Sequence, residues 1–342
     1  MRTVTRTIFD AAGWIAQVAF LVVISVFIVS RGAEAQPPSP AKIYRIGFLS
    51  SGFPGTARGP LGPFVEGMRA LGWLEGRDYL IEARFAEGHP DRLPTLATDL
   101  LQSNVDLIAA GGATASLAAK NATASVPIVV VGAGDPVGVG LVSSLSRPGG
   151  NVTGVAWDVG QETFTKSLEI LRDAFPKLRR IAVLSNPSNP GQASAIGKIK
   201  AASALLSEEI QFLEARDPAH LERAFASAAE ERSEAILILT DTVFIGQRKR
   251  LAELATRYRL PSMMGIGEYV EIGGLISYGP SLPAALHRAA FFVDKILSGT
   301  KPADLPVEQP TKFELIINLK TAEALGVDIP ESILMRADRI VE

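Results

Sequence analysis

The chain has 342 residues, a formal net charge of −2 at pH 7, three histidines and no cysteine. This length exceeds one ordinary hydrophobic core and fits about two domains. The absence of cysteine excludes disulfides, thiolate metal sites and a cysteine nucleophile, and three widely separated histidines disfavour a histidine-rich metal site. The near-neutral charge, with no basic helix, disfavours a nucleic-acid partner held through its phosphates.

The N-terminus is typical of an export signal. Two arginines precede an uncharged apolar run over residues 11–29, and an Ala-Glu-Ala motif follows at residues 33–35. A positive start, an apolar core and small residues at the cleavage point make up a signal peptide. We therefore expect residues 1–35 to be the signal peptide and residues 36–43 a stiff, proline-containing linker. The apolar run is also long enough for a retained membrane anchor, and this alternative stays open.

From residue 44 onward, short β-branched runs alternate with amphipathic stretches. Leu61, Phe64 and Met68, for example, are three and four residues apart and share one face of a helix. The pattern predicts strands at residues 44–50, 79–85, 105–109, 127–131 and 152–156, and helices at 61–71, about 90–101 and 113–121. Alternation of this kind indicates an α/β fold with parallel strands joined by crossover helices.

The same pattern begins again after residue 157. It predicts strands at residues 180–185, 210–214, 235–239 and 261–264, and helices at 164–175, 192–206, 218–232 and 243–258. The segment at residues 45–50 (RIGFLS) is similar to that at 180–185 (RIAVLS). The matched order along both halves predicts two similar lobes, although any two βα halves share some likeness.

The residues after about 270 are too few to form a third core. They contain predicted strands at residues 275–278 and 313–318 and predicted helices at 283–298 and 321–325. We expect these elements to complete the two lobes. The chain then crosses between the lobes more than once, and the crossings form a hinge.

Candidate ligand-binding positions follow from the fold class, because parallel α/β sheets bind ligands at the carboxyl ends of their strands. In the first half, this rule selects Ser50, Ser51, Phe53, Gly112, Ala113, Thr114 and Asp135, with Trp157 near the first crossing. In the second half, it selects Asn186, Ser188, Asp241 and Glu268.

The glycine pair at residues 111–112 ends a buried strand and opens a helix. Backbone N–H groups at Ala113 and Thr114 would lie at the positive end of that helix, where they suit a carboxylate or a phosphate. The hydroxyls of Ser51 and Thr114 would add donors for a carboxylate. The alternative is that the glycines only make a tight turn between strand and helix.

Other side chains in the set suit the remaining parts of a small ligand. Asp241 or Asp135 would bind an ammonium group, and Phe53 and Trp157 would stack on an apolar or aromatic body. Each has a structural alternative. Asp135 precedes a proline and would cap a helix, the two serines would shape a turn, and Trp157 would pack at the hinge.

The sequence lacks the common signatures of a nucleotide-dependent or hydrolytic enzyme. It contains no Gly-x-x-x-x-Gly-Lys-Ser/Thr phosphate loop and no Gly-x-Ser-x-Gly nucleophile elbow. The segment Gly132-Ala133-Gly134 lacks the third glycine of a dinucleotide fingerprint. We therefore expect no cofactor and no catalytic residues.

Several motifs, in this order, resemble one known family. They are Arg45-Ile46-Gly47-Phe48-Leu49, Ala110-Gly111-Gly112-Ala113, Gly134-Asp135-Pro136-Val137, Pro148-Gly149-Gly150-Asn151-Val152-Thr153-Gly154, Gly273-Gly274-Leu275-Ile276-Ser277-Tyr278-Gly279 and Leu305-Pro306-Val307-Glu308-Gln309-Pro310. With them, the chain resembles the exported solute-binding proteins of ABC transporters with the type I periplasmic binding fold. It is most similar to the branch that includes binders of tryptophan and other aromatic amino acids.

This resemblance implies two Rossmann-like lobes with parallel sheets, joined by a multi-crossing hinge. We expect lobe 1 at residues 42–157 plus 280–300 and lobe 2 at 158–279 plus 306–342.

The implied function is non-enzymatic capture of a small organic ligand, such as an amino acid or an aromatic or carboxylate compound. The partner would be an ABC permease in the inner membrane, and the protein a periplasmic monomer. The loops at residues 185–190 and 240–242 vary within the family, so ligand identity does not carry over.

Two other functions stay open from the sequence. An exported sensory module that reports its ligand to a membrane receptor would have the same fold and a different partner. An enzyme on a two-lobed α/β scaffold would instead turn its ligand over.

Overall fold

The structure is a computed structural model that describes residues 42–54, 61–157, 161–206 and 209–342. The predicted signal peptide and nearly all of the linker lie outside the described residues and stay predictions. Within the described ranges, no helix combines the length and the apolar character that a membrane span needs.

The first sheet has five parallel strands in the order β2-β1-β3-β4-β5. The strands are β1 (Tyr44–Ser50), β2 (Tyr79–Phe85), β3 (Leu107–Gly111), β4 (Ile128–Ala133) and β5 (Val152–Ala156). Ser50 at the end of β1 pairs with Phe85 on one side and Gly111 on the other. The carboxyl ends of these strands therefore lie at one edge of the sheet.

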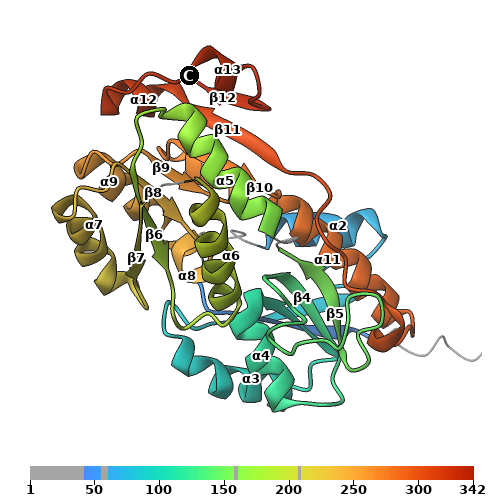
Figure 1. Ribbon diagram of the computed structural model, residues 1–342. Coiled ribbons are helices and arrows are strands. Elements are labelled where there is room, and N and C mark those ends of the chain that lie inside the picture. Colours follow the sequence, from blue (N-terminus) through green and yellow to red (C-terminus); the bar gives the residue numbers. More distant parts are fainter. Residues whose placement is uncertain (1–41, 55–60, 158–160, 207–208) are drawn as a thin grey trace, which may run out of the picture. The chain divides into compact units, whose positions relative to one another are not determined.

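Helices cover both faces of the first sheet (Figure 1). One face packs on α3 (Leu93–Gln102), which follows the 3₁₀ turn η1 (Pro90–Arg92), and on α4 (Gly112–Ala122). The other face packs on α2 (Gly62–Ala70) and on α11 (Leu282–Leu297), which comes from the end of the chain. Ile108 points to the first core and Leu107 to the second, as the two-residue period of a strand requires. We call this sheet with its four helices the first lobe.

The second sheet has seven strands in the order β12-β11-β10-β9-β8-β6-β7. They are β6 (Arg180–Ser185), β7 (Glu209–Glu214), β8 (Ala235–Ile238), β9 (Ser262–Met264), β10 (Ile276–Gly279), β11 (Glu314–Asn318) and β12 (Arg339–Val341). Strands β7-β6-β8-β9-β10 repeat the order of the first sheet, which confirms the predicted likeness of the two halves. The pattern of parallel strands is broken only between β10 and β11, which pair antiparallel.

Helices also cover both faces of the second sheet. One core contains side chains from α5 (Gln161–Ala174), α6 (Gly191–Leu206), α12 (Leu319–Leu325) and α13 (Glu331–Leu334). The opposite core contains side chains from α7 (Leu221–Glu230), α8 (Thr242–Gly246), α9 (Arg248–Arg257) and α10 (Gly267–Glu271). The remaining 3₁₀ turns are η2 (Pro218–His220) and η3 (Pro302–Asp304). We call this sheet with its helices the second lobe.

The single helix predicted at residues 243–258 is wrong, because the structure has two helices there. Asp241 caps α8, which ends after one turn, and α9 begins at Arg248. The apolar spacing continues across the break, so periodicity alone does not reveal it. The short strand β12 was not predicted, since three mostly exposed residues are too few to show the two-residue period of a strand.

The chain passes between the lobes three times, after β5, after β10 and after η3. At the third crossing, Glu308 N donates to Gly154 O at 2.9 Å and Glu308 O accepts from Ala156 N at 2.8 Å, so this segment runs beside β5. The multi-crossing connection is thus present, while the residue boundaries of the two lobes stay a prediction.

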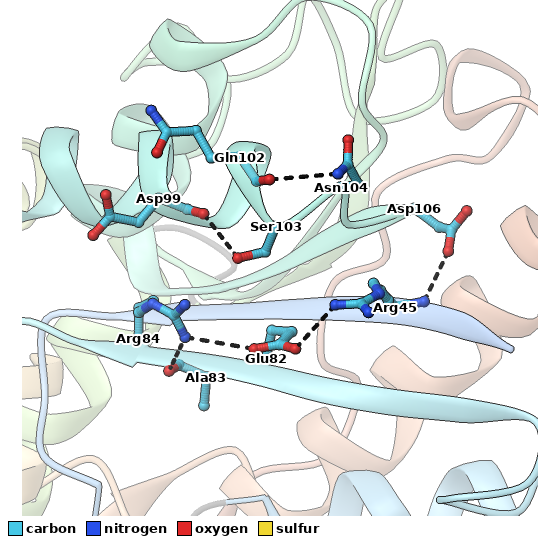
Figure 2. Close-up of polar contacts among 9 residues, drawn as sticks. All are labelled: Arg45, Glu82, Ala83, Arg84, Asp99, Gln102, Ser103, Asn104 and Asp106. Carbon is cyan, nitrogen blue, oxygen red and sulfur yellow. Dashed lines mark hydrogen bonds and ion pairs between the residues drawn. The ribbon is translucent and has the colours of Figure 1, made fainter.

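The edge strand β2 carries charged side chains (Figure 2). Glu82 contacts Arg45 at 3.4 Å and Arg84 at 3.7 Å, and the backbone N of Arg45 donates to Asp106 Oδ2 at 2.7 Å. Ion pairs as exposed as these contribute about 0–1 kcal/mol each. Their effect is to make the open edge of the sheet a poor template for another strand.

Candidate functional site

A cavity of about 110 Å³ lies where the carboxyl ends of the two sheets face each other. Both lobes contribute to its wall. The first lobe provides Gly112, Ala113, Val131, Gly132 and Gly134, and the second provides Asn189, Gln192, Thr240, Asp241 and Tyr278, among others. Trp157 lines it from the first crossing. This is the position at which α/β sheets bind ligands.

The first-lobe wall contains the N-terminus of α4. Strand β3 ends at Gly111, and α4 begins at Gly112, whose φ of +75° favours glycine. No side chain caps this helix. The first N–H groups of a helix have no partner within it, and the helix dipole makes this end positive. With Gly112 and Ala113 in the cavity wall, α4 presents donors suited to a carboxylate.

The second-lobe wall contains Asp241, a buried carboxylate that caps α8. Its Oδ1 accepts from Val243 N at 2.9 Å and from Asn186 Nδ2 at 3.1 Å, and its Oδ2 accepts from Asn189 Nδ2 at 2.8 Å. Burial raises the pKa of the Asp241 carboxyl above its ordinary value of 3.8, and these hydrogen bonds oppose the rise. The backbone of Phe244 also hydrogen-bonds to this carboxylate, so the roughly four acceptor positions of Asp241 are used within the second lobe. A ligand cation beside it would be attracted by its charge.

A pH dependence follows from Asp241. Since its folded pKa is raised, the native state holds more protons than the unfolded chain in the window above pH 3.8. The contribution of Asp241 to the free energy of unfolding therefore falls as pH rises through that window. We expect the stability difference between the wild type and Asp241→Asn to fall in the same way, measured by urea unfolding from pH 4 to 7. Parallel pH profiles for the two proteins would contradict this.

A hydrogen-bonded network holds the loop after β6 against the loop after β8. Gln192 Oε1 accepts from Asn186 N at 2.6 Å, and Gln192 Nε2 donates to Thr240 O at 3.2 Å. Asn186 and Gln192 are almost completely buried. Together with Asp241, they fix the polar wall before any ligand arrives, which limits the entropy that binding costs.

An apolar chamber extends from this polar wall into the second lobe. Its aromatic members are Trp157, Phe164 and Tyr278, and its aliphatic members include Ala195, Leu237 and Met263. The Trp157 ring lies against the backbone of Gly132, where an added Cβ would come within 3.1 Å of the ring. The Tyr278 ring packs on Phe313 with centroids 5.8 Å apart. The chamber is suited to an apolar or aromatic group.

The structure brings four of the sequence-predicted positions to the cavity wall, namely Gly112, Ala113, Trp157 and Asp241. Thr114 is the next residue in α4, and Asn186 is bonded to Asp241 behind the wall. Ser188 N donates to Asn186 Oδ1 at 2.9 Å in the same loop. A role in ligand contact stays a prediction for all of these residues.

The other predicted positions lie elsewhere. Ser50 ends β1, Ser51 and Phe53 follow it in the next loop, and none of the three is part of the cavity wall. Asp135 Oδ1 accepts from Gly138 N at 2.9 Å in a turn, and no helix begins at this point of the described range 61–157, so the alternative that it caps a helix is wrong. Glu268 lines a second cavity with Glu271 and Arg339, and burial raises the pKa of its carboxyl.

Sequence reasoning missed several residues of the cavity wall. Asn189 and Gln192 follow β6 as Asn186 does, and the rule that selected Asn186 could have included them. Phe164 and Tyr278 gave no signal, because an aromatic residue inside a helix or strand is usually part of a core.

Comparison with known proteins agrees with this architecture. A tyrosine-binding protein of Clostridioides difficile is 24% identical over 264 residues, which cover 77% of this chain and 75% of that protein. A conserved domain protein from Vibrio cholerae O1 biovar eltor has a TM-score of 0.81 at 26% identity, covering 87% of this chain and all of that one. An ABC domain from Streptococcus pneumoniae in complex with L-Trp has a TM-score of 0.78 at 23% identity, covering 88% and 100%.

Two α/β lobes with three crossings and a cavity between their sheet edges define the type I periplasmic binding fold. The model of the family described as "ABC transporter substrate binding protein" matches residues 60–341. The chain belongs to that family, whose members bind small-molecule ligands and work with ABC transporters.

Proposed function

We propose that this protein captures an amino acid with an aromatic side chain in the cavity between its lobes. It then delivers the ligand unchanged to an ABC permease in the inner membrane. It acts as a periplasmic monomer after residues 1–35 are removed. On binding, two lobes close about the crossings, one at residues 42–157 plus 280–300 and the other at 158–279 plus 306–342. The observation that carries the proposal is the wall of the cavity, where the α4 N-terminus, the Asp241 carboxylate and an aromatic chamber meet.

Each part of such a ligand has a matching part of the wall. The carboxylate fits the N–H groups at the start of α4, and the ammonium group fits beside the negative charge of Asp241 in the opposite wall. The aromatic ring fits the chamber of Trp157, Phe164 and Tyr278. The proteins named for tyrosine and L-Trp among the relatives support this assignment.

Magnitudes indicate which part supplies most of the affinity. Binding in the micromolar range corresponds to about −8 kcal/mol. Burying an aromatic side chain of about 200 Å² at about 25 cal/mol per Å² contributes about 5 kcal/mol. A hydrogen bond to a charged group contributes a net 1.5–3 kcal/mol or so. The chamber therefore contributes about as much as the two charged ends together and more than either end alone, and the charged ends fix the orientation.

A set of matched ligands tests the proposal by isothermal titration calorimetry on protein purified from the periplasm. L-Phenylalanine, L-tyrosine and L-tryptophan should include the tightest binder. L-Phenylalaninamide lacks the carboxylate and 3-phenylpropionate lacks the ammonium group, so each should bind roughly 10- to 100-fold more weakly than L-phenylalanine. L-Alanine lacks the ring and should bind weakest of all.

The same experiment shows where the proposal would fail. If L-alanine bound as tightly as the aromatic amino acids, the chamber would have no part in recognition. If none of the amino acids bound, the ligand class would be wrong. Conversion of a bound ligand into a product would establish an enzyme in place of a carrier.

A further inference from the structure

Outside the cavity, the loop after β1 touches the second lobe. Ser51 and Thr242 are hydrogen-bonded through their hydroxyl groups, although they are 191 positions apart in the sequence. A Cβ added to Gly52 would lie 2.9 Å from the carbonyl oxygen of Thr242, so the two backbones approach closely. We call the contact of Ser51, Gly52 and Phe53 with the second lobe the rim clasp.

The Phe53 ring is the largest part of the rim clasp. It lies between two glycines, one from each lobe. A Cβ added to Gly88 would lie 3.3 Å from Phe53 Cζ, and a Cβ added to Gly246 would overlap the ring at Cδ2. Pro218 of the second lobe also packs on Gly88, at 3.1 Å from the position of that added Cβ. At both positions, the missing side chain leaves space for the Phe53 ring, and a Cβ would intrude on that space.

Both sides of the rim clasp are held firmly. On the first lobe, Ser50 Oγ accepts from Gly52 N at 3.1 Å, and Gly88 N donates to Ser51 O at 2.9 Å. On the second lobe, Thr242 is the first residue of α8, directly after its cap Asp241. Because each side of the rim clasp is fixed within its own lobe, the clasp influences how the two lobes lie relative to each other.

The rim clasp is separate from the ligand. Phe53 and Gly246 do not line the cavity, whereas Thr242 contacts the clasp and also lines the cavity beside Asp241. We propose that Phe53 is a positioning residue, which stabilises the closed arrangement of the lobes without contact to the ligand. Phe53 was predicted to stack on the ligand, and its contacts with Gly88 and Gly246 assign it this other role.

The consequence is a link between the clasp and ligand release. A ligand that is held only by the closed form has an apparent affinity that scales with the fraction of closed protein. Removing the Phe53 ring lowers that fraction, with or without ligand. In the ligand-bound protein, we expect dissociation to become roughly tenfold faster with little change in association, since opening precedes release.

The first test needs no ligand. The chain has no cysteine, so Thr98→Cys on α3 and Glu253→Cys on α9 place one label on each lobe. Single-molecule energy transfer between the labels reports the open and closed populations. Phe53→Ala should shift the ligand-free protein to the longer distance. Trp73→Ala is the matched control, because it removes another half-buried ring from the first lobe, one that packs on Tyr44 and donates to Asp294 there, and it should leave the distances unchanged.

The second test is a double-mutant cycle. Gly246→Ala should open the wild-type protein, because the new methyl group meets the Phe53 ring, and should have no further effect in Phe53→Ala. A distance distribution unchanged by Phe53→Ala, or an effect of Gly246→Ala that persists without the ring, would overturn the proposal.

The prediction for ligand release rests on the proposed function, and stopped-flow dissociation of L-tryptophan measures it. A closed population that depends on Phe53 supports the clasp even if L-tryptophan does not bind. Binding with an unchanged dissociation rate in Phe53→Ala would overturn the clasp and leave the proposed function intact.

Discussion

Asp241→Ala is expected to weaken ligand binding by about a hundredfold or more and to lower the free energy of unfolding by about 3 kcal/mol. The substitution removes the helix cap of α8, and it leaves Asn186 Nδ2 and Val243 N without an acceptor. A lost cap costs about 1 kcal/mol, and each buried group without a partner costs about 1–3 kcal/mol. The cavity loses both its carboxylate and the network that holds the loops after β6 and β8.

The effect on binding must be separated from the effect on stability. Asn318→Ala is the matched control, because Asn318 also caps a helix from a buried position and donates to Val270 O at 3.0 Å. It should lower stability by a similar amount and leave affinity for the best aromatic amino acid within about twofold. Titration calorimetry and urea unfolding measure the two quantities. Equal losses of affinity in the two variants would mean that Asp241 acts through stability alone.

Gly154→Ala is expected to prevent folding or to lower the free energy of unfolding by about 4 kcal/mol or more. Gly154 lies in β5 with a φ of +133°, where side chains other than hydrogen are strained. An added Cβ would overlap the carbonyl oxygen of Val130 and lie 2.6 Å from its nitrogen, on the neighbouring strand β4. Backbone atoms in a paired sheet cannot move aside as a flexible side chain does.

A glycine in open space provides the control for Gly154. Gly197 lies in α6, and an added Cβ there meets nothing within 4 Å. Gly197→Ala should raise the free energy of unfolding by about 0.5–1 kcal/mol, because alanine favours the helix. Soluble yield and urea unfolding compare the two variants. A Gly154→Ala protein of wild-type stability would show that β4 and β5 are not paired in this way.

The bounds of several strands agree with the sequence prediction to the residue, and the reason is local. Strands β1, β2 and β6 are short runs rich in apolar residues that end near turn residues, and both the pattern and its ends are visible in the sequence. The division of residues 243–258 into α8 and α9 was not visible. It depends on the Asp241 cap and on packing of both short helices in one core, and these are contacts between distant parts of the chain.

The sequence predicted the site only in part, because the direction of each side chain depends on contacts between distant parts of the chain. The rule on strand ends placed Gly112, Ala113 and Asp241 correctly at the edge where the cavity lies. It could not say which way each side chain points, so Ser51 and Phe53 were grouped with residues of the cavity wall. Nor could it show that Phe164 and Tyr278 line a chamber, since that depends on how α5 and β10 pack.

The amino-acid sequence by itself determined the class of fold, the repeat of its two halves and the sheet edge at which the cavity lies, because alternation and strand ends are local properties of the chain. Only the tertiary structure decided which side chains at that edge face the cavity and which join the lobes. That choice depends on the approach of residues as far apart as Ser51 and Thr242. No spacing along the sequence encodes such a contact, because it arises only once both sheets have formed.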